Sequence, residues 1–108
     1  MSINLPKPID AYFAADNTDS EAITLCFIEA ATVKDEGHTY NGLAAIKQWK
    51  ADSSKKYAYT SVPFACEEKD GKIIVSSQVR GNFVGSPVDL RYFFDLEDNK
   101  IASLEIRV

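Results

Sequence analysis

The chain has 108 residues, of which 26% are charged and 45% are hydrophobic, a composition typical of one folded domain spanning residues 1–108. Its formal net charge is −4 at pH 7. This balance argues against nucleic acid and anionic membrane as partners, because both bind proteins with a surplus of Lys and Arg.

The cysteines and the first residues of the chain indicate a reducing compartment. Cys26 and Cys66 lack the C-x-x-C spacing and lie among apolar neighbours, which predicts two buried free thiols. We find no signal-peptide pattern and no apolar run as long as a membrane span, so a cytoplasmic location is expected. One histidine and two separate cysteines are too few ligands for a metal site, and no cofactor is expected.

Helical spacing of apolar residues dominates the first half of the chain and predicts three helices. The first begins near Pro6 or Pro8, the second after Thr18, and the third after Asn41 as its cap. The stripes expected to be buried are Leu5, Ile9, Tyr12 and Phe13; Ile23, Cys26, Phe27 and Ala30; and Leu43, Ile46 and Trp49. Short extended segments at 31–37 and 38–40 separate the last two helices.

Four lysines fall in or just after the third predicted helix. They are Lys47, Lys50, Lys55 and Lys56. A basic run toward the end of a helix favours the helix dipole and solubility, so we interpret these side chains as a solvated helix face.

From residue 57 onward the apolar residues alternate with a period of two, which indicates β-strands. Strands are predicted at 57–68, 73–83, 88–97 and 100–108. Asp70-Gly71 and Asp98-Asn99 supply hairpin turns, and residues 85–87 supply another. Helices followed by a run of hairpins predict an α+β fold.

Four segments carry a family resemblance through their order and spacing. They are ATVKDEG at 31–37, YNG at 40–42 leading to Ile46 and Trp49, GNFVGSPVDLRY at 81–92, and Lys100-Ile101-x-x-Leu104-x-Ile106. The chain resembles the SnoaL-like branch of the nuclear transport factor 2-like superfamily along essentially its whole length. This resemblance implies a cone-shaped, cystatin-like roll, in which three N-terminal helices pack on a curved antiparallel sheet around a largely apolar cavity. Members include isomerases, cyclases and epoxide hydrolases, and also proteins without a known activity.

Strand parity decides which side chains of the strand at 88–97 reach such a cavity. The apolar face, which must point to the core, comprises Leu90, Tyr92, Phe94 and Leu96. Asp89, Arg91 and Asp95 then point outward. Epoxide hydrolases of the superfamily use an Asp-Arg-Asp set to activate water, so the outward position of these three residues disfavours that activity.

The outward face of the sheet combines charges of both signs with an aromatic residue. Arg80, Arg91 and Phe93 belong to it by parity. Such a face is either simply solvated or the interface of a homodimer, because Arg and aromatic residues are enriched at interfaces. We expect a homodimer through this face, and sedimentation of a monomer at micromolar concentration would exclude it.

Asp35 and His38 are the candidate catalytic residues. Asp35 follows Val33 by two and should share its buried side, where an apolar wall raises the pKa of a carboxyl group and suits it to acid–base catalysis. The alternative is that Asp35 only closes the turn through backbone hydrogen bonds. His38, beside it in the hairpin, is either a proton carrier or plain polar surface.

Aromatic side chains are the candidate substrate-binding residues. They are Tyr12, Trp49, Tyr57, Tyr59, Phe83 and Tyr92. The resemblance to isomerases implies that a tyrosine hydroxyl and an acid together stabilise an enolate. The sequence therefore predicts a domain that binds a small apolar molecule, with isomerase-like or cyclase-like acid–base chemistry as one outcome. The alternative is a non-catalytic dimerisation or ligand-binding domain whose cone is filled by its own side chains.

Overall fold

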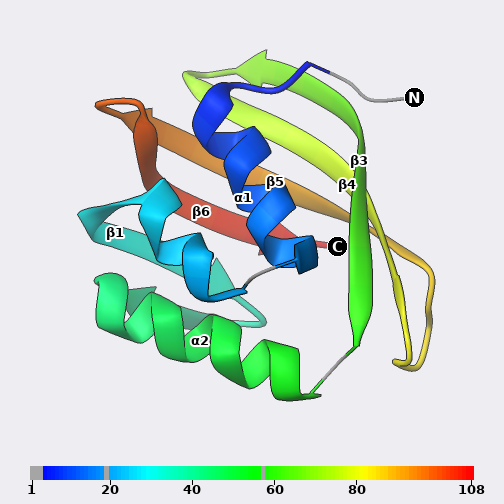
Figure 1. Cartoon of the computed structure of the whole chain (residues 1–108). Coiled ribbons are helices and arrows are strands. Elements are labelled where there is room, and N and C mark those ends of the chain that lie inside the picture. The colour runs from blue at the N-terminus through cyan, green and yellow to red at the C-terminus, as the bar shows by residue number, and fades with distance from the viewer. Residues whose placement is uncertain (1–3, 19, 57) are drawn as a thin grey trace.

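A curved sheet of six strands wraps around helix α1 in the part of the chain that the structure describes (Figure 1). The computed structural model describes residues 4–18, 20–56 and 58–108. In chain order the elements are α1 (Lys7–Thr18), the 3-10 helix η1 (Ser20–Cys26), β1 (Phe27–Asp35), β2 (His38–Asn41), α2 (Leu43–Lys56), β3 (Tyr59–Lys69), β4 (Lys72–Gly81), β5 (Val88–Glu97) and β6 (Lys100–Arg107). The α+β prediction is confirmed.

The sheet has the strand order β2-β1-β6-β5-β4-β3. Every neighbouring pair is antiparallel except β1 and β6, which run parallel. The prediction of an antiparallel sheet is therefore wrong for this one pair. The chain leaves β2 through α2 and enters the far edge as β3, and the hairpins then bring β6 back beside β1 (Figure 1).

The predicted second helix is wrong in type and length. Ser20–Cys26 is a 3-10 helix, and β1 begins directly after it at Phe27. Phe27 pairs with Ile101 of β6, so pairing within the sheet overrides the helical spacing of nearby apolar residues. Two α-helices, rather than three, thus cover the sheet in the described ranges. In those ranges no helix is both long and apolar enough to cross a membrane.

Helix α1 lies in the concave side of the sheet and carries the centre of the core (Figure 1). Ile9, Tyr12 and Phe13 are 0%, 0% and 3% exposed, which confirms this part of the predicted stripe, whereas Leu5 precedes the helix and is half-buried. The ring of Tyr12 lies 6.1 Å from that of Phe27 and 5.7 Å from that of Phe94, in edge-to-face geometry. Such aromatic packing fixes α1 against both halves of the sheet.

Two of the predicted hairpin turns occur where the sequence places them. Asp70-Gly71 and Asp98-Asn99 all have positive φ angles, as a two-residue hairpin turn requires. The strand between the later turns, β5, has the predicted bounds Val88–Glu97. Tyr92 and Phe94 are buried and Leu90 and Leu96 are half-buried against the core, whereas Asp89 and Arg91 are exposed, so the predicted parity is confirmed.

The two cysteines are both free thiols, as predicted, but only one is buried. Cys26 is covered by the core, whereas Cys66 is exposed. Cys66 belongs to the second half of the edge strand β3, where every residue from 64 to 69 is exposed. The prediction of a buried Cys66 is wrong because this end of the strand extends beyond the core.

Candidate functional site

A cavity of about 600 Å³ opens on the concave side of the sheet, next to α1 and α2. Its lining combines aromatic and aliphatic side chains with one lysine and two carboxylates. The lining residues are Tyr12, Asp35, Glu36, Trp49, Lys50, Ser53, Tyr59, Val79, Asn82, Phe83, Val84, Leu90, Tyr92 and Ile106. A mostly apolar pocket with a few convergent polar groups is the usual form of a small-molecule site.

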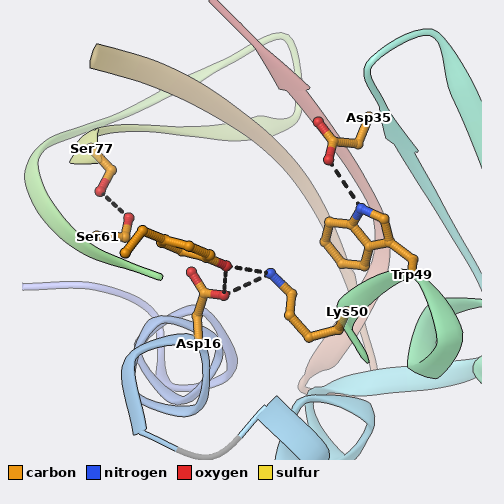
Figure 2. A network of polar contacts seen from close by, with 7 residues as sticks. Asp16, Asp35, Trp49, Lys50, Ser61 and Ser77 are labelled. Carbon is orange, nitrogen blue, oxygen red and sulfur yellow. Dashed lines mark hydrogen bonds and ion pairs between the residues drawn. The ribbon is translucent and has the colours of Figure 1, made fainter. Parts of the chain in front are cut away.

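Asp35 is one of the two acidic residues that line the cavity, and its surroundings suit it to acid–base chemistry. It ends β1, just before the Glu36-Gly37 turn, and accepts a hydrogen bond of 3.0 Å at Oδ2 from Trp49 Nε1 (Figure 2). Burial raises the pKa of the Asp35 carboxyl, and the hydrogen bond from Trp49 offsets part of the rise. A carboxyl group with a raised pKa next to a cavity can both accept and return a proton.

His38 is placed differently from the expectation. It pairs directly with Asp35 across the β1–β2 hairpin, yet its side chain is exposed. The described residues that line the cavity include Asp35 but not His38. The structure therefore does not bring the two candidate catalytic residues together in one pocket, since β2 is an edge strand with one neighbour.

The aromatic candidates largely gather at the cavity. Its lining includes Tyr12, Trp49, Tyr59, Phe83 and Tyr92, whereas Tyr57 lies outside the described residues. Trp49 is 4% exposed, so it belongs to the core and to the cavity wall at once. Burial raises the pKa of the Tyr92 hydroxyl, although a hydrogen bond with Ser61 works against this rise. A tyrosine in this state remains a hydrogen-bond donor.

A buried ion pair lies beside the cavity and was missed by sequence reasoning. Lys50 Nζ lies 2.6 Å from Asp16 Oδ1 and 3.0 Å from the Tyr59 hydroxyl, which itself donates to Asp16 Oδ1 over 2.6 Å (Figure 2). The side chains of Lys50 and Asp16 are 4% and 1% exposed. Burial, followed by the charge of Asp16, raises the pKa of Tyr59 far above its ordinary value.

Aromatic rings surround the ammonium group of Lys50. Its Nζ lies 4.4 Å from the ring centroid of Trp49, 5.7 Å from that of Tyr59 and 5.8 Å from that of Tyr12. These distances allow cation–π attraction, which is strongest where water is excluded. The interpretation of Lys50 as part of a solvated helix face is therefore wrong.

Helical spacing contained a signal for this pair. Lys50 follows Leu43 and Ile46 at intervals that place all three on one face of α2, and Asp16 follows Phe13 by three on α1. Both residues thus occupy positions that the period assigns to the buried stripe. Grouping Lys50 with the other lysines by charge alone concealed this.

The start of β3 is held in place by two hydrogen bonds between Ala58 and Asn82, next to Tyr59. Ala58 N donates to Asn82 Oδ1, and Asn82 N donates to the carbonyl of Ala58. A Cβ at Gly81 would meet the Ala58 carbonyl at 2.2 Å, so only glycine allows this approach. The space beside Gly81 is therefore occupied by the start of β3.

The Asp-Arg-Asp set of β5 lies away from the cavity, as parity predicted. Asp89 and Arg91 are exposed, and Asp95 accepts bonds of 2.6 Å from Lys72 Nζ and 2.8 Å from the Ser103 hydroxyl. None of the three lines the cavity among the described residues. Water activation by this set is therefore disfavoured.

Solved structures show what this fold and cavity are similar to. A protein of Sinorhizobium meliloti, provisionally described as a polyketide cyclase, is 38% identical, with 95% of each chain covered and a TM-score of 0.90. A protein of Catenulispora acidiphila with a ketosteroid isomerase-like fold, solved with trimethylamine, is 18% identical over 97% of this chain and 87% of that chain, with a TM-score of 0.84. The epoxide hydrolase/cyclase-like enzyme SalBIII has a role in pyran ring formation in the polyether salinomycin. It is 24% identical over 93% of this chain and 86% of that chain, with a TM-score of 0.77. No family model and no curated protein matches the sequence.

The fold and the cavity define the class as an α+β domain of the nuclear transport factor 2-like type. Within that class the chain belongs to the SnoaL-like family, since its similarity to the Sinorhizobium meliloti protein extends over 95% of both chains.

Proposed function

We propose that this protein is an acid–base enzyme of the isomerase or cyclase type. It takes a small, mostly apolar molecule with a carbonyl group into the cone and moves a proton with Asp35. The observation that carries this proposal is the position of Asp35, a carboxyl group in the cavity wall whose pKa is raised by burial and whose orientation Trp49 fixes over 3.0 Å. Enzymes tune carboxyl groups for proton transfer in this way.

The size and the lining of the cavity support a ligand rather than a filled cone. About 600 Å³ lies within the range of pockets that hold small molecules. Aromatic side chains such as Tyr12 and Tyr92 offer flat apolar walls, and the tyrosine hydroxyls can orient a polar substituent. The similarity to a protein provisionally described as a polyketide cyclase favours cyclase-type chemistry further.

Exchange of α-protons in a model ketone tests the proposal. We expect the protein to accelerate loss of the α-proton signals of 2-tetralone in D2O, followed by ¹H NMR, because Asp35 removes such a proton in an apolar site. Asp35→Asn keeps the shape and removes the titrating group, so it should reduce the acceleration about 100-fold to 10,000-fold. Asp95→Asn, which alters a carboxylate on the outer face, is the matched control and should keep the wild-type rate.

The proposal makes the rate depend on the protonation state of Asp35. Because the raised pKa moves the carboxylate form to higher pH, exchange should decline as the pH falls through that pKa, before ordinary aspartates are protonated. Equal exchange in wild-type protein and Asp35→Asn, or no acceleration over buffer by the wild-type protein, would contradict the proposed function.

A further inference from the structure

Lys50, which lines the cavity, lies between the carboxylates of Asp16 and Asp35 (Figure 2). On one side its Nζ lies 2.6 Å from Asp16 Oδ1. On the other side it faces the ring of Trp49, whose Nε1 edge donates to Asp35. One indole ring therefore separates the ammonium group from Asp35, and both groups line the cavity.

The burial of this pair needs an explanation other than stability. Side chains that are 4% and 1% exposed have lost almost all their hydration, and their mutual attraction repays that cost only in part. Apolar side chains of similar volume stabilise a core as well or better. What the pair provides instead is a cation at a fixed position in the cavity wall, shielded from water by its own burial.

Within the described ranges, two acceptors receive hydrogen bonds from the ammonium group of Lys50. An ammonium group has three N–H donors. Among the contacts of the described residues, Asp16 and the Tyr59 hydroxyl accept two of them. The third is available to an oxygen atom that enters the cavity, while the rings around Nζ hold the ammonium group in place.

We propose that Lys50 stabilises the negative oxygen that forms when Asp35 removes a proton, so that the substrate is a ketone or 1,3-dicarbonyl compound with an acidic C–H bond next to its carbonyl. This inference rests on the proposed function. The C–H bond breaks, its proton goes to the Asp35 carboxylate, and its electron pair forms a carbon–carbon double bond. The carbonyl π electrons move onto the oxygen, which accepts a hydrogen bond from Lys50 Nζ. In a ketone whose acidic C–H bond also lies next to a carbon–carbon double bond, return of the proton from Asp35 to the far carbon of that double bond shifts the bond and completes an isomerisation.

The placement of the two groups around Trp49 suits such a substrate. The carbonyl oxygen lies in the plane of the carbonyl group, whereas the C–H bond that breaks stands out of that plane, so the donor and the base must approach the substrate from different directions. The ammonium group of Lys50 lies at the face of the Trp49 indole, and the carboxylate of Asp35 lies at its edge. Both residues line the same cavity. A donor that is already oriented before proton removal lowers the energy of the enolate more than water does.

Binding of 2-naphthol tests the role of Lys50 separately from catalysis. Its ionised form carries a negative oxygen on a planar apolar body and absorbs at longer wavelength than the neutral form. In Asp35→Asn the amide replaces the protonated carboxyl group of the enolate state. We expect the pKa of 2-naphthol bound to this variant to lie about one unit or more below that of free 2-naphthol. Such a shift means that the anion binds at least about tenfold more tightly than the neutral form.

Two further variants on the Asp35→Asn background decide the source of that shift. Adding Asp16→Asn together with Lys50→Met should abolish it, and replacing both charges avoids leaving Asp16 buried without a partner. Adding Lys72→Met with Asp95→Asn, an equally short pair on the outer face, should leave the shift in place.

The outcomes separate this inference from the proposed function. Unchanged ionisation after the loss of Lys50, or no binding of 2-naphthol to Asp35→Asn, would overturn the role of Lys50. Exchange of 2-tetralone protons that needs Asp35 but not Lys50 would reject the inference and leave the proposed function standing. Loss of exchange in both Asp35→Asn and the Asp16→Asn/Lys50→Met variant would support both.

Discussion

Two lysine–aspartate pairs in this molecule share one geometry and have opposite surroundings. Lys50 and Asp16 lie 2.6 Å apart beside the cavity, with side chains 4% and 1% exposed. Lys72 and Asp95 also lie 2.6 Å apart, on the outer face of the sheet, with side chains 46% and 42% exposed. Distance alone would rank the two pairs as equal.

The difference in exposure gives the two pairs different consequences. Water around Lys72 and Asp95 screens their attraction and can replace either partner. Around Lys50 and Asp16 there is little water to do so, which makes the loss of one partner costly and the field of the charge strong. The inner pair can therefore influence a bound molecule, whereas the outer pair has little effect beyond its own surface.

Removal of one partner of the inner pair should produce the largest effect on stability. Lys50→Ala leaves Asp16 buried without a countercharge, and losses of this kind cost about 3–5 kcal/mol in the free energy of unfolding. Urea unfolding followed by circular dichroism measures the change. Asp16→Asn combined with Lys50→Met should recover most of the stability, and a loss below about 1 kcal/mol for Lys50→Ala would mean that the inner pair behaves like a surface pair.

Removal of the outer pair should give the smallest effect. Lys72→Ala should lower the free energy of unfolding by about 0–1 kcal/mol, since exposed pairs contribute no more than that. The effect should shrink further at high salt, where exposed charges are screened. A loss as large as that of Lys50→Ala would show that exposure does not distinguish the two pairs.

Most of the fold could be predicted from local sequence signals. Hairpin turns are indicated by Asp70-Gly71 and Asp98-Asn99. The alternation of apolar residues in Val88–Glu97 identifies the face of β5 that points to the core. The start of β1 could not be predicted in this way, because Phe27 extends to pair with Ile101, a residue near the other end of the chain. Long-range pairing of this kind leaves no trace in a short window.

The candidate site was predictable only in part. Parity places Asp35 on the side of Val33, and the structure puts it in the cavity wall. The contribution of Lys50 depends on Asp16, which lies 34 residues away on another helix, so the pair cannot be identified from either helix alone. His38 pairs directly with Asp35, but it lies on the edge strand β2, which has no further strand beyond it, and its side chain is exposed.

The two aspartates with opposite pKa shifts should also respond oppositely to pH. Burial raises the folded-state pKa of Asp35, so its ionised form opposes folding at neutral pH, and this penalty disappears as the pH falls below the ordinary aspartate value of 3.8. The hydrogen bond from Lys72 lowers the pKa of Asp95, which adds stability above that value and loses it as the pH falls through the lowered pKa.

Titration of individual carboxyl groups by ¹³C NMR tests this contrast most directly. The side-chain carboxyl signals of all aspartates are followed from acid to neutral pH, and spectra of Asp35→Asn and Asp95→Asn assign the two signals. We expect Asp35 to titrate above 3.8 and Asp95 below it, in the same sample. Titration of Asp35 at or below the midpoint of Asp95 would contradict the claim that burial in the cavity wall prepares Asp35 for proton transfer.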